Sequence, residues 1–300
     1  MLGAAAAALA CTIGGCSDDG RCPVQPTTPH PCPSLLLISE NTKLVDLQPT
    51  WRPGSPSDIA FVHEAWDSQR PTAEPQEEIW TAQVPSGSRS YQCPGSSVSW
   101  SESGTLLAVT RMDARNVLQL WVRDLARGTE RQITSGDSST TNASFAPTDS
   151  AIVCERRPRA SSFGVIWTYD LTTGKGRRLR DGYTPRWSPR GDRIAYGPTL
   201  TIWQLDHEDS VVVIDTLQSA DVLEWRPDGE SFYCSARVRG YRSIYEVHLD
   251  TGGVDLVLPG ITQATFGNAA GQYVFAGSVL EADSTALFYH DDEKGCLQLR

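Results

Sequence analysis

The sequence predicts an all-β protein, a six-bladed β-propeller built from four-stranded antiparallel blades. The main observation is a unit of about 40 residues that recurs six times, and each copy contains four strand-length runs. Composition agrees with this prediction. The 300 residues include 19 prolines and 25 glycines but only two methionines, which favours many short strands and turns over long helices.

Each unit is marked by an aromatic residue, which we call its anchor. The clearest copies are WSPRGDRIAYG, which starts at Trp187, and WRPDGESFYC, which starts at Trp225. The six anchors in chain order are Trp51, Trp100, Phe145, Trp187, Trp225 and Phe266. In the two clearest copies a proline and a glycine follow the anchor. Because proline presets φ and glycine tolerates positive φ, we expect a tight turn after the first strand.

A second aromatic residue recurs in the third strand-length run of each unit. These residues are Trp80, Trp121, Trp167, Trp203, Tyr245 and Phe288. One four-stranded sheet cannot bury both of its faces, so we expect the blades to stand radially and to pack their aromatic side chains against one another. Both aromatic sets are therefore interpreted as packing residues, not as a ligand platform.

With these repeats, the chain resembles the TolB-type six-bladed propeller and its WD40-like repeat, over roughly residues 48–300. TolB carries a further domain ahead of its propeller, for which we find no counterpart here, so the resemblance does not supply TolB's partners. Related propellers gate prolyl peptidases, but the chain contains no Gly-x-Ser-x-Gly nucleophile motif. The resemblance therefore implies a fold and an exported binding protein.

The domain boundaries follow from the repeats. We expect a propeller over residues 35–300, with blades that start near residues 48, 97, 142, 184, 222 and 263. The runs at 35–38 and 42–47 resemble a hairpin ahead of the first blade. If this hairpin completes the last blade, the final run CLQLR is a tail and the count stays at six. The alternative is a partial seventh blade.

The first 34 residues are interpreted as an export signal and a tether. Residues 1–15 are uncharged and mostly small or apolar, as in a signal peptide. The run Ile13-Gly14-Gly15-Cys16 resembles a bacterial lipobox, which implies cleavage before Cys16 and a lipid on its sulfur atom; Cys11 is the alternative. The signal departs from the usual pattern because no lysine or arginine precedes its apolar stretch. An ordinary apolar N-terminus with a buried cysteine therefore stays open.

The proline-rich tether covers residues 16–34. Cys22 and Cys32 lie within it, and in an oxidising compartment they could form a disulfide. With the signal, these features predict a lipid-anchored protein of the bacterial cell envelope, periplasmic or on the outer surface. The lipid is the predicted contact with a membrane.

Charge excludes one class of partner and suggests another. The net charge is −10 and the pI is about 5.0, so a protein that coats nucleic acid is not expected. Residues 150–195 reverse this balance, with ten basic and four acidic side chains. Arg156, Arg157 and Arg159 are therefore candidate contacts for an anionic partner. The alternative is that they are solvated charges at strand ends.

Three further residues are candidate binding residues. Trp66 lies in the longest insertion, at 64–77, and fits neither aromatic register. Arg186 and Glu224 each precede an anchor tryptophan, so they could line a central channel. Alternation along a strand does not by itself show whether they reach it.

The sequence predicts binding rather than catalysis. The five histidines are scattered, and none has a Ser or Cys partner at a readable spacing. We expect no metal site, no cofactor and a monomer. The predicted function is a non-catalytic scaffold that binds a protein or another envelope component. The alternative is a metal-dependent hydrolase or cyclase centred on the channel.

Overall fold

The computed structural model describes residues 45–65, 76–84, 86, 88–205, 211–238, 240–267, 272–278, 285–291 and 295–298. These residues form 24 strands joined by turns. In this part of the chain, no helix is long and apolar enough to cross a membrane. The predicted signal and tether, with Cys16, Cys22 and Cys32, lie outside the described residues, and so does Trp66.

The strands follow one another in six groups of four, and within each group sequence neighbours pair antiparallel. The first two groups are β1 (Val45–Trp51), β2 (Asp58–Ala65), β3 (Gln76–Gln83), β4 (Ser88–Pro94), β5 (Ser97–Trp100), β6 (Leu106–Met112), β7 (Leu118–Asp124) and β8 (Thr129–Gln132). The next two are β9 (Ser138–Phe145), β10 (Ala151–Pro158), β11 (Val165–Asp170), β12 (Gly176–Asp181), β13 (Tyr183–Trp187), β14 (Arg193–Gly197), β15 (Thr201–Gln204) and β16 (Val211–Val213). The last two are β17 (Gln218–Trp225), β18 (Ser231–Val238), β19 (Tyr241–His248), β20 (Val254–Leu258), β21 (Ala264–Phe266), β22 (Tyr273–Ser278), β23 (Thr285–Asp291) and β24 (Gly295–Gln298).

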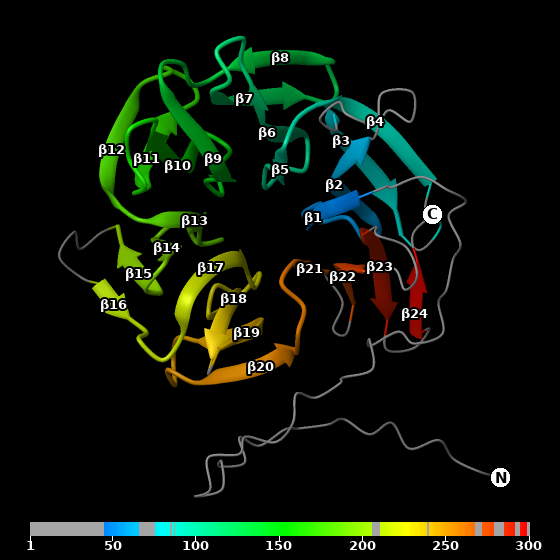
Figure 1. Ribbon diagram of the computed structural model, residues 1–300, viewed down its shortest axis with the longest axis vertical. Helices are drawn as coiled ribbons and strands as arrows, with labels where there is room; N and C mark the ends of the chain where they lie inside the picture. The colour runs from blue at the N-terminus through cyan, green and yellow to red at the C-terminus, as the bar shows by residue number, and fades with distance from the viewer. Residues whose placement is uncertain are drawn as a thin grey trace, which may run out of the picture.

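The sheets stand radially around a central axis, with the first strand of each group innermost (Figure 1). Around the axis each innermost strand contacts the innermost strands of the neighbouring groups, and β21 contacts β1. The protein is therefore an all-β propeller with four-stranded antiparallel blades, as predicted.

The predicted number of blades is corrected. Four groups are separate sheets, but the first and last groups share one eight-stranded sheet, because Val45 of β1 pairs in parallel with Thr285 of β23. The described residues therefore form five sheets, and the predicted counts of six or seven separate blades are wrong. The physical reason is that ring closure brings β1 beside β23, where backbone groups pair instead of staying unsatisfied.

The predicted roles of the two chain ends also change. Val45 to Leu47 belong to β1, where Leu47 pairs with Val62. The rest of the expected hairpin, at 35–44, lies outside the described residues. The run that begins at Cys296 is no tail, because β24 pairs with β23 through Tyr289 and Leu297. In each case an adjacent strand offers backbone partners that the sequence pattern did not reveal.

The anchors occupy one repeated position. Each is the last residue of its innermost strand, and each pairs with a large apolar residue of the second strand, as Trp187 does with Ile194 and Trp225 with Phe232. The predicted turns follow them. Gly191 and Gly229 have φ values of 77° and 71°, and each closes its turn through a backbone hydrogen bond.

Packing between neighbouring groups forms the core. Trp100 is 7% exposed and packs against Ala60, Val62 and Ile79 of the preceding group. Its Nε1 atom also donates a hydrogen bond to the Thr50 carbonyl, at 3.2 Å. Among the third-strand aromatics, Trp203 is buried and pairs with Ile194, the residue that also pairs with the anchor Trp187. The other five lie opposite the second-strand residue two positions beyond the partner of their anchor. Trp51, Trp100 and Phe145 are buried in the apolar clusters of the core, and Trp187, Trp225 and Phe266 are partly buried against such clusters.

Candidate functional site

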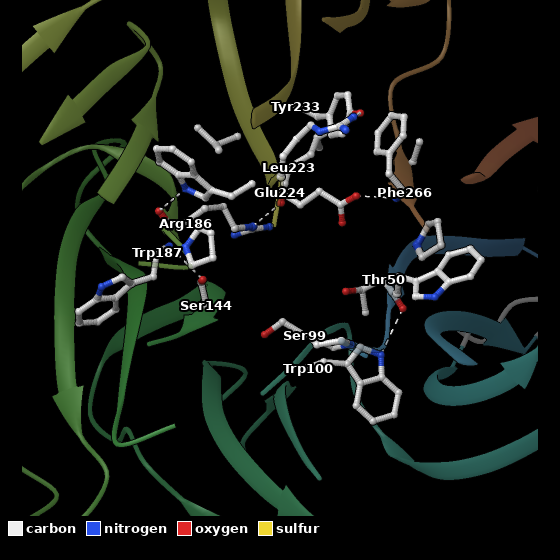
Figure 2. A pocket seen from close by; sticks show the side chains of 18 of the residues that line it. Thr50, Ser99, Trp100, Ser144, Arg186, Trp187, Leu223, Glu224, Tyr233 and Phe266 are labelled. Atoms are coloured by element: carbon white, nitrogen blue, oxygen red, sulfur yellow. Dashed lines mark hydrogen bonds between the residues drawn. The ribbon is translucent and has the colours of Figure 1, made fainter. Parts of the chain in front are cut away.

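A cavity of about 1000 Å³ lies at the centre of the propeller, and residues of all six innermost strands line it (Figure 2). The anchors form part of its wall. The cavity is therefore a product of the radial arrangement, because no single blade encloses it.

The residue immediately before each anchor is polar, and we call these six residues the hub ring. They are Thr50, Ser99, Ser144, Arg186, Glu224 and Thr265. Five of them line the cavity, whereas Thr265 is only 1% exposed. Four of the six side chains carry a hydroxyl group. The remaining two are a cation and an anion on neighbouring strands, β13 and β17.

Arg186 is held by backbone oxygen atoms. Its Nε atom donates to the Leu223 carbonyl at 2.7 Å, and Nη1 donates to the carbonyls of Pro185 at 3.0 Å and Asn142 at 3.4 Å. Burial lowers the pKa of Arg186 to about 10, although nearby carboxylates, that of Glu224 foremost, oppose this shift. Arg186 forms no ion pair with any carboxylate of the described residues.

Glu224 is held from the opposite side, by β21. One carboxylate oxygen accepts a hydrogen bond from the Phe266 amide, and the other accepts from Thr265 Oγ1 at 2.8 Å. Thr265 Oγ1 in turn accepts from the Trp51 amide at 2.9 Å, which ties the carboxylate to β1. Burial raises the pKa of Glu224 to about 7 against the effect of these bonds and of Arg186. The side chain therefore changes charge near neutral pH.

Strained backbone lies on the cavity wall. Gln48, Asn142 and Thr184 have φ values of 49°, 53° and 46°, and each lies three residues before an anchor, at a β-bulge. A positive φ costs a residue with a side chain free energy, and such positions cluster at binding sites. The buried Glu155 carboxylate braces two of them, because its Oε2 atom accepts from Asn142 Nδ2 at 3.0 Å and from the Thr184 amide at 3.3 Å.

A further bulge sets the position of Arg186. In β17 the extra residue is Leu223, since Val222 pairs with Cys234 while Glu224 pairs with Tyr233. The bulge turns the Leu223 carbonyl toward Arg186 and leaves Glu224 facing the cavity.

Among the predicted binding residues that the structure describes, two lie together. Arg186 and Glu224 reach the cavity wall, whereas Arg156, Arg157 and Arg159 do not line it. Arg156 donates to the Tyr169 hydroxyl at 2.8 Å and to the Ser135 carbonyl at 2.9 Å, and Arg157 pairs with Glu155 at 2.7 Å. Arg159 is exposed in the turn after β10. Their contact with an anionic partner stays a prediction.

The sequence analysis missed the rest of the hub ring. Thr50, Ser99 and Ser144 hold the same position before an anchor as Arg186 and Glu224, so an alignment of the six units on their anchors would have found them. Ser99 Oγ is buried and has no hydrogen-bond partner among the described residues. Such an atom is costly unless a water molecule or a ligand reaches it.

No protein-family model matches this sequence, and a search of curated proteins found no match. Solved structures share its fold. TolB from Acinetobacter baumannii is 15% identical with a TM-score of 0.65, over 88% of this chain and 64% of that one. The β-propeller domain of the Trilobed protease from Pyrococcus furiosus, which has an open velcro topology, is 13% identical with a TM-score of 0.58, over 87% and 97%.

An enzyme also shares the fold. An oligogalacturonate lyase in complex with manganese is 15% identical with a TM-score of 0.55, over 85% of this chain and 77% of the lyase. This chain covers 64% of the TolB structure, which is less than two thirds of its length. At the identities given above, the similarity shows the fold alone. Since these structures include both TolB and enzymes, the fold neither assigns nor excludes catalysis.

Proposed function

We propose that this protein is a non-catalytic propeller scaffold of the bacterial cell envelope that binds a protein segment or another envelope component in the cavity at its hub. The observation that carries this proposal is the pair Arg186 and Glu224, two charged side chains that line one cavity without an ion pair between them. Buried charges without a charged partner are costly, so their presence in a concave site favours binding.

The alternative is a metal-dependent hydrolase or cyclase that uses the same cavity. The similarity to a lyase with manganese is the observation in its favour. A cation site needs several oxygen or nitrogen ligands in one place. In the part of the chain that the structure describes, no three His, Cys, Asp or Glu side chains are grouped to hold a metal ion. The donor set on the cavity wall therefore favours the scaffold.

Removal of the two hub charges is expected to abolish capture of the partner. In a pull-down from detergent-solubilised envelope, the wild-type protein retains a stoichiometric partner, and the double variant Arg186→Gln/Glu224→Gln loses it. Loss of hydrogen bonds to charged groups weakens binding by roughly tenfold or more for each group.

The matched control is Glu230→Gln, because Glu230 is exposed and does not line the cavity. It removes one negative charge and should leave capture unchanged. Equal capture by the wild-type protein and the double variant would contradict a binding role for the cavity.

We also propose that the protein reaches the envelope through a lipid on Cys16. Replacement Cys16→Ser is expected to move the protein from the membrane fraction to the soluble fraction, because the lipobox-like run then lacks the thiol that carries the lipid. Fractionation after expression in a bacterium measures this change. Cys11→Ser is the matched control and should leave the protein with the membranes. If Cys16→Ser stays in the membrane fraction, the anchor is not at this residue.

A further inference from the structure

The two charged residues of the hub ring lie on one side of it, and their placement indicates the class of ligand that it could bind. Only β13 and β17 contribute a charged residue to the ring, and these strands are neighbours. They are also fixed against each other, because Arg186 Nε donates to the Leu223 carbonyl and Trp225 Nε1 donates to the Arg186 carbonyl at 3.1 Å. The cation and the anion are thus held side by side by backbone contacts rather than by mutual attraction.

Arg186 keeps donor capacity on the cavity side. Its backbone bonds use Nε and Nη1, and Nη2 donates to no described residue. A guanidinium binds a carboxylate well through two parallel N–H groups. Figure 2 shows the Arg186 side chain extending from β13 toward the space beside Glu224. Arg186 can therefore accept the carboxylate of a bound molecule.

Glu224 keeps acceptor capacity on the same side. Each of its oxygen atoms accepts one hydrogen bond, in both cases from β21, and a carboxylate oxygen can accept more than one. An ammonium group supplies three donors and a positive charge. Glu224 can therefore accept the ammonium group of a bound molecule.

The two charges together select against simpler ligands. A plain anion drawn to Arg186 meets the Glu224 carboxylate, and a plain cation drawn to Glu224 meets the Arg186 guanidinium. Only a molecule with both charges close together compensates both residues. Thr50 and Ser99 also line this wall, and the Oγ atom of Ser99 is buried without a partner among the described residues.

We propose that the hub cavity binds a free α-amino-acid head group, in which an ammonium and a carboxylate are attached to one carbon atom. The carboxylate lies on Arg186 and the ammonium on Glu224. This inference rests on the proposed function, since it assigns a ligand class to the same cavity. The cavity, at about 1000 Å³, is larger than the head group, so the remainder of the ligand has room beside it.

Isothermal titration calorimetry with matched probes tests this inference. The probes are free alanine, phenylalanine, lysine and glutamate, with the N-acetyl and the C-terminal amide form of each. A further probe is a lysine whose Nε atom is joined to a blocked peptide. Its α-amino and α-carboxyl groups stay free, so the head group is part of a larger molecule. It distinguishes a free amino acid from a head group that belongs to an envelope polymer.

We expect at least one free head group to bind the wild-type protein, and loss of either charge from that probe to weaken binding by about tenfold or more. Glu224→Gln should no longer distinguish the free amine from the N-acetyl form. Arg186→Gln should no longer distinguish the free acid from the amide, and Arg186→Lys should restore part of that preference. Glu230→Gln should keep both preferences. Circular dichroism and thermal unfolding establish that each variant is folded.

The inference is overturned if no free head group binds at millimolar concentration, or if capped and free forms bind equally. In that case, a partner still captured by the wild-type protein and lost by the Arg186→Gln/Glu224→Gln variant would leave the proposed function standing. If no free head group binds and the double variant still captures the partner as the wild-type protein does, both proposals are overturned.

Discussion

Replacement of Trp100 by alanine is expected to lower the free energy of unfolding by roughly 3–5 kcal/mol. The side chain is 7% exposed and fills the space between the first and second strand groups, and its Nε1 atom bonds the Thr50 carbonyl across that boundary. The variant therefore leaves a cavity at the boundary between these two groups and removes a hydrogen bond across it. Urea denaturation followed by tryptophan fluorescence and circular dichroism measures the change.

The matched control for this variant is Phe163→Ala. Phe163 is also aromatic, but it is 69% exposed in the loop between β10 and β11. Its removal should change the free energy of unfolding by no more than about 0.5 kcal/mol. A loss below about 1 kcal/mol for Trp100→Ala would show that the anchors do not carry the contacts between the blades.

The second prediction concerns pH. Burial raises the pKa of Glu224 from 4.5 to about 7, so between these values the folded state keeps a proton that the unfolded state has released. Stability should therefore fall as the pH rises through this window, and stay level above it. The raised pKa of Glu224 sets an upper limit of about 3 kcal/mol on this decrease in the free energy of unfolding. Water in the cavity makes the decrease smaller.

The variant Glu224→Gln is expected to remove this pH-dependent decrease in stability. Its amide NH₂ group takes the place of the protonated oxygen and stays neutral at every pH. The variant should match the wild-type protein near pH 5 and exceed its stability near pH 8, by an amount up to the limit of about 3 kcal/mol. Urea denaturation of both proteins at the two pH values measures the difference.

Two groups that face this carboxylate titrate above that window. Arg186 faces Glu224 from β13 with a pKa of about 10, and burial raises the pKa of Tyr233, on β18, above its usual value of 10. An equal stability difference between the two proteins at both pH values would therefore contradict a raised pKa at Glu224.

The repeat could be read from the sequence because its chemistry is local. A proline and a glycine that closely follow an aromatic residue mark a turn, and the aromatic residue marks the end of the strand before it. The anchors Trp187 and Trp225 and their turns at Gly191 and Gly229 follow this rule in the structure. The poorer copies at Phe145 and Phe266 keep the same strand position, although their turn residues differ.

The candidate site could be predicted only in part. Arg186 and Glu224 were singled out because each precedes an anchor, but alternation along a strand does not show which side chains face the axis. Bulges decide that question here, since the extra residue at Leu223 leaves Glu224 toward the cavity. The bulges at Gln48 and Thr184 carry no clear sequence signal, because neither residue type favours a positive φ.

The sequence by itself determined the all-β propeller, the four-stranded blade and the aromatic residues that pack between blades, because hydrophobic alternation and turn chemistry act over a few residues. Only the tertiary structure decided how the ring closes, with β1 against β23, and which polar residues meet at the hub. Those contacts join residues that are far apart in the chain. They depend on backbone hydrogen bonds and bulges, which form only after the blades have packed.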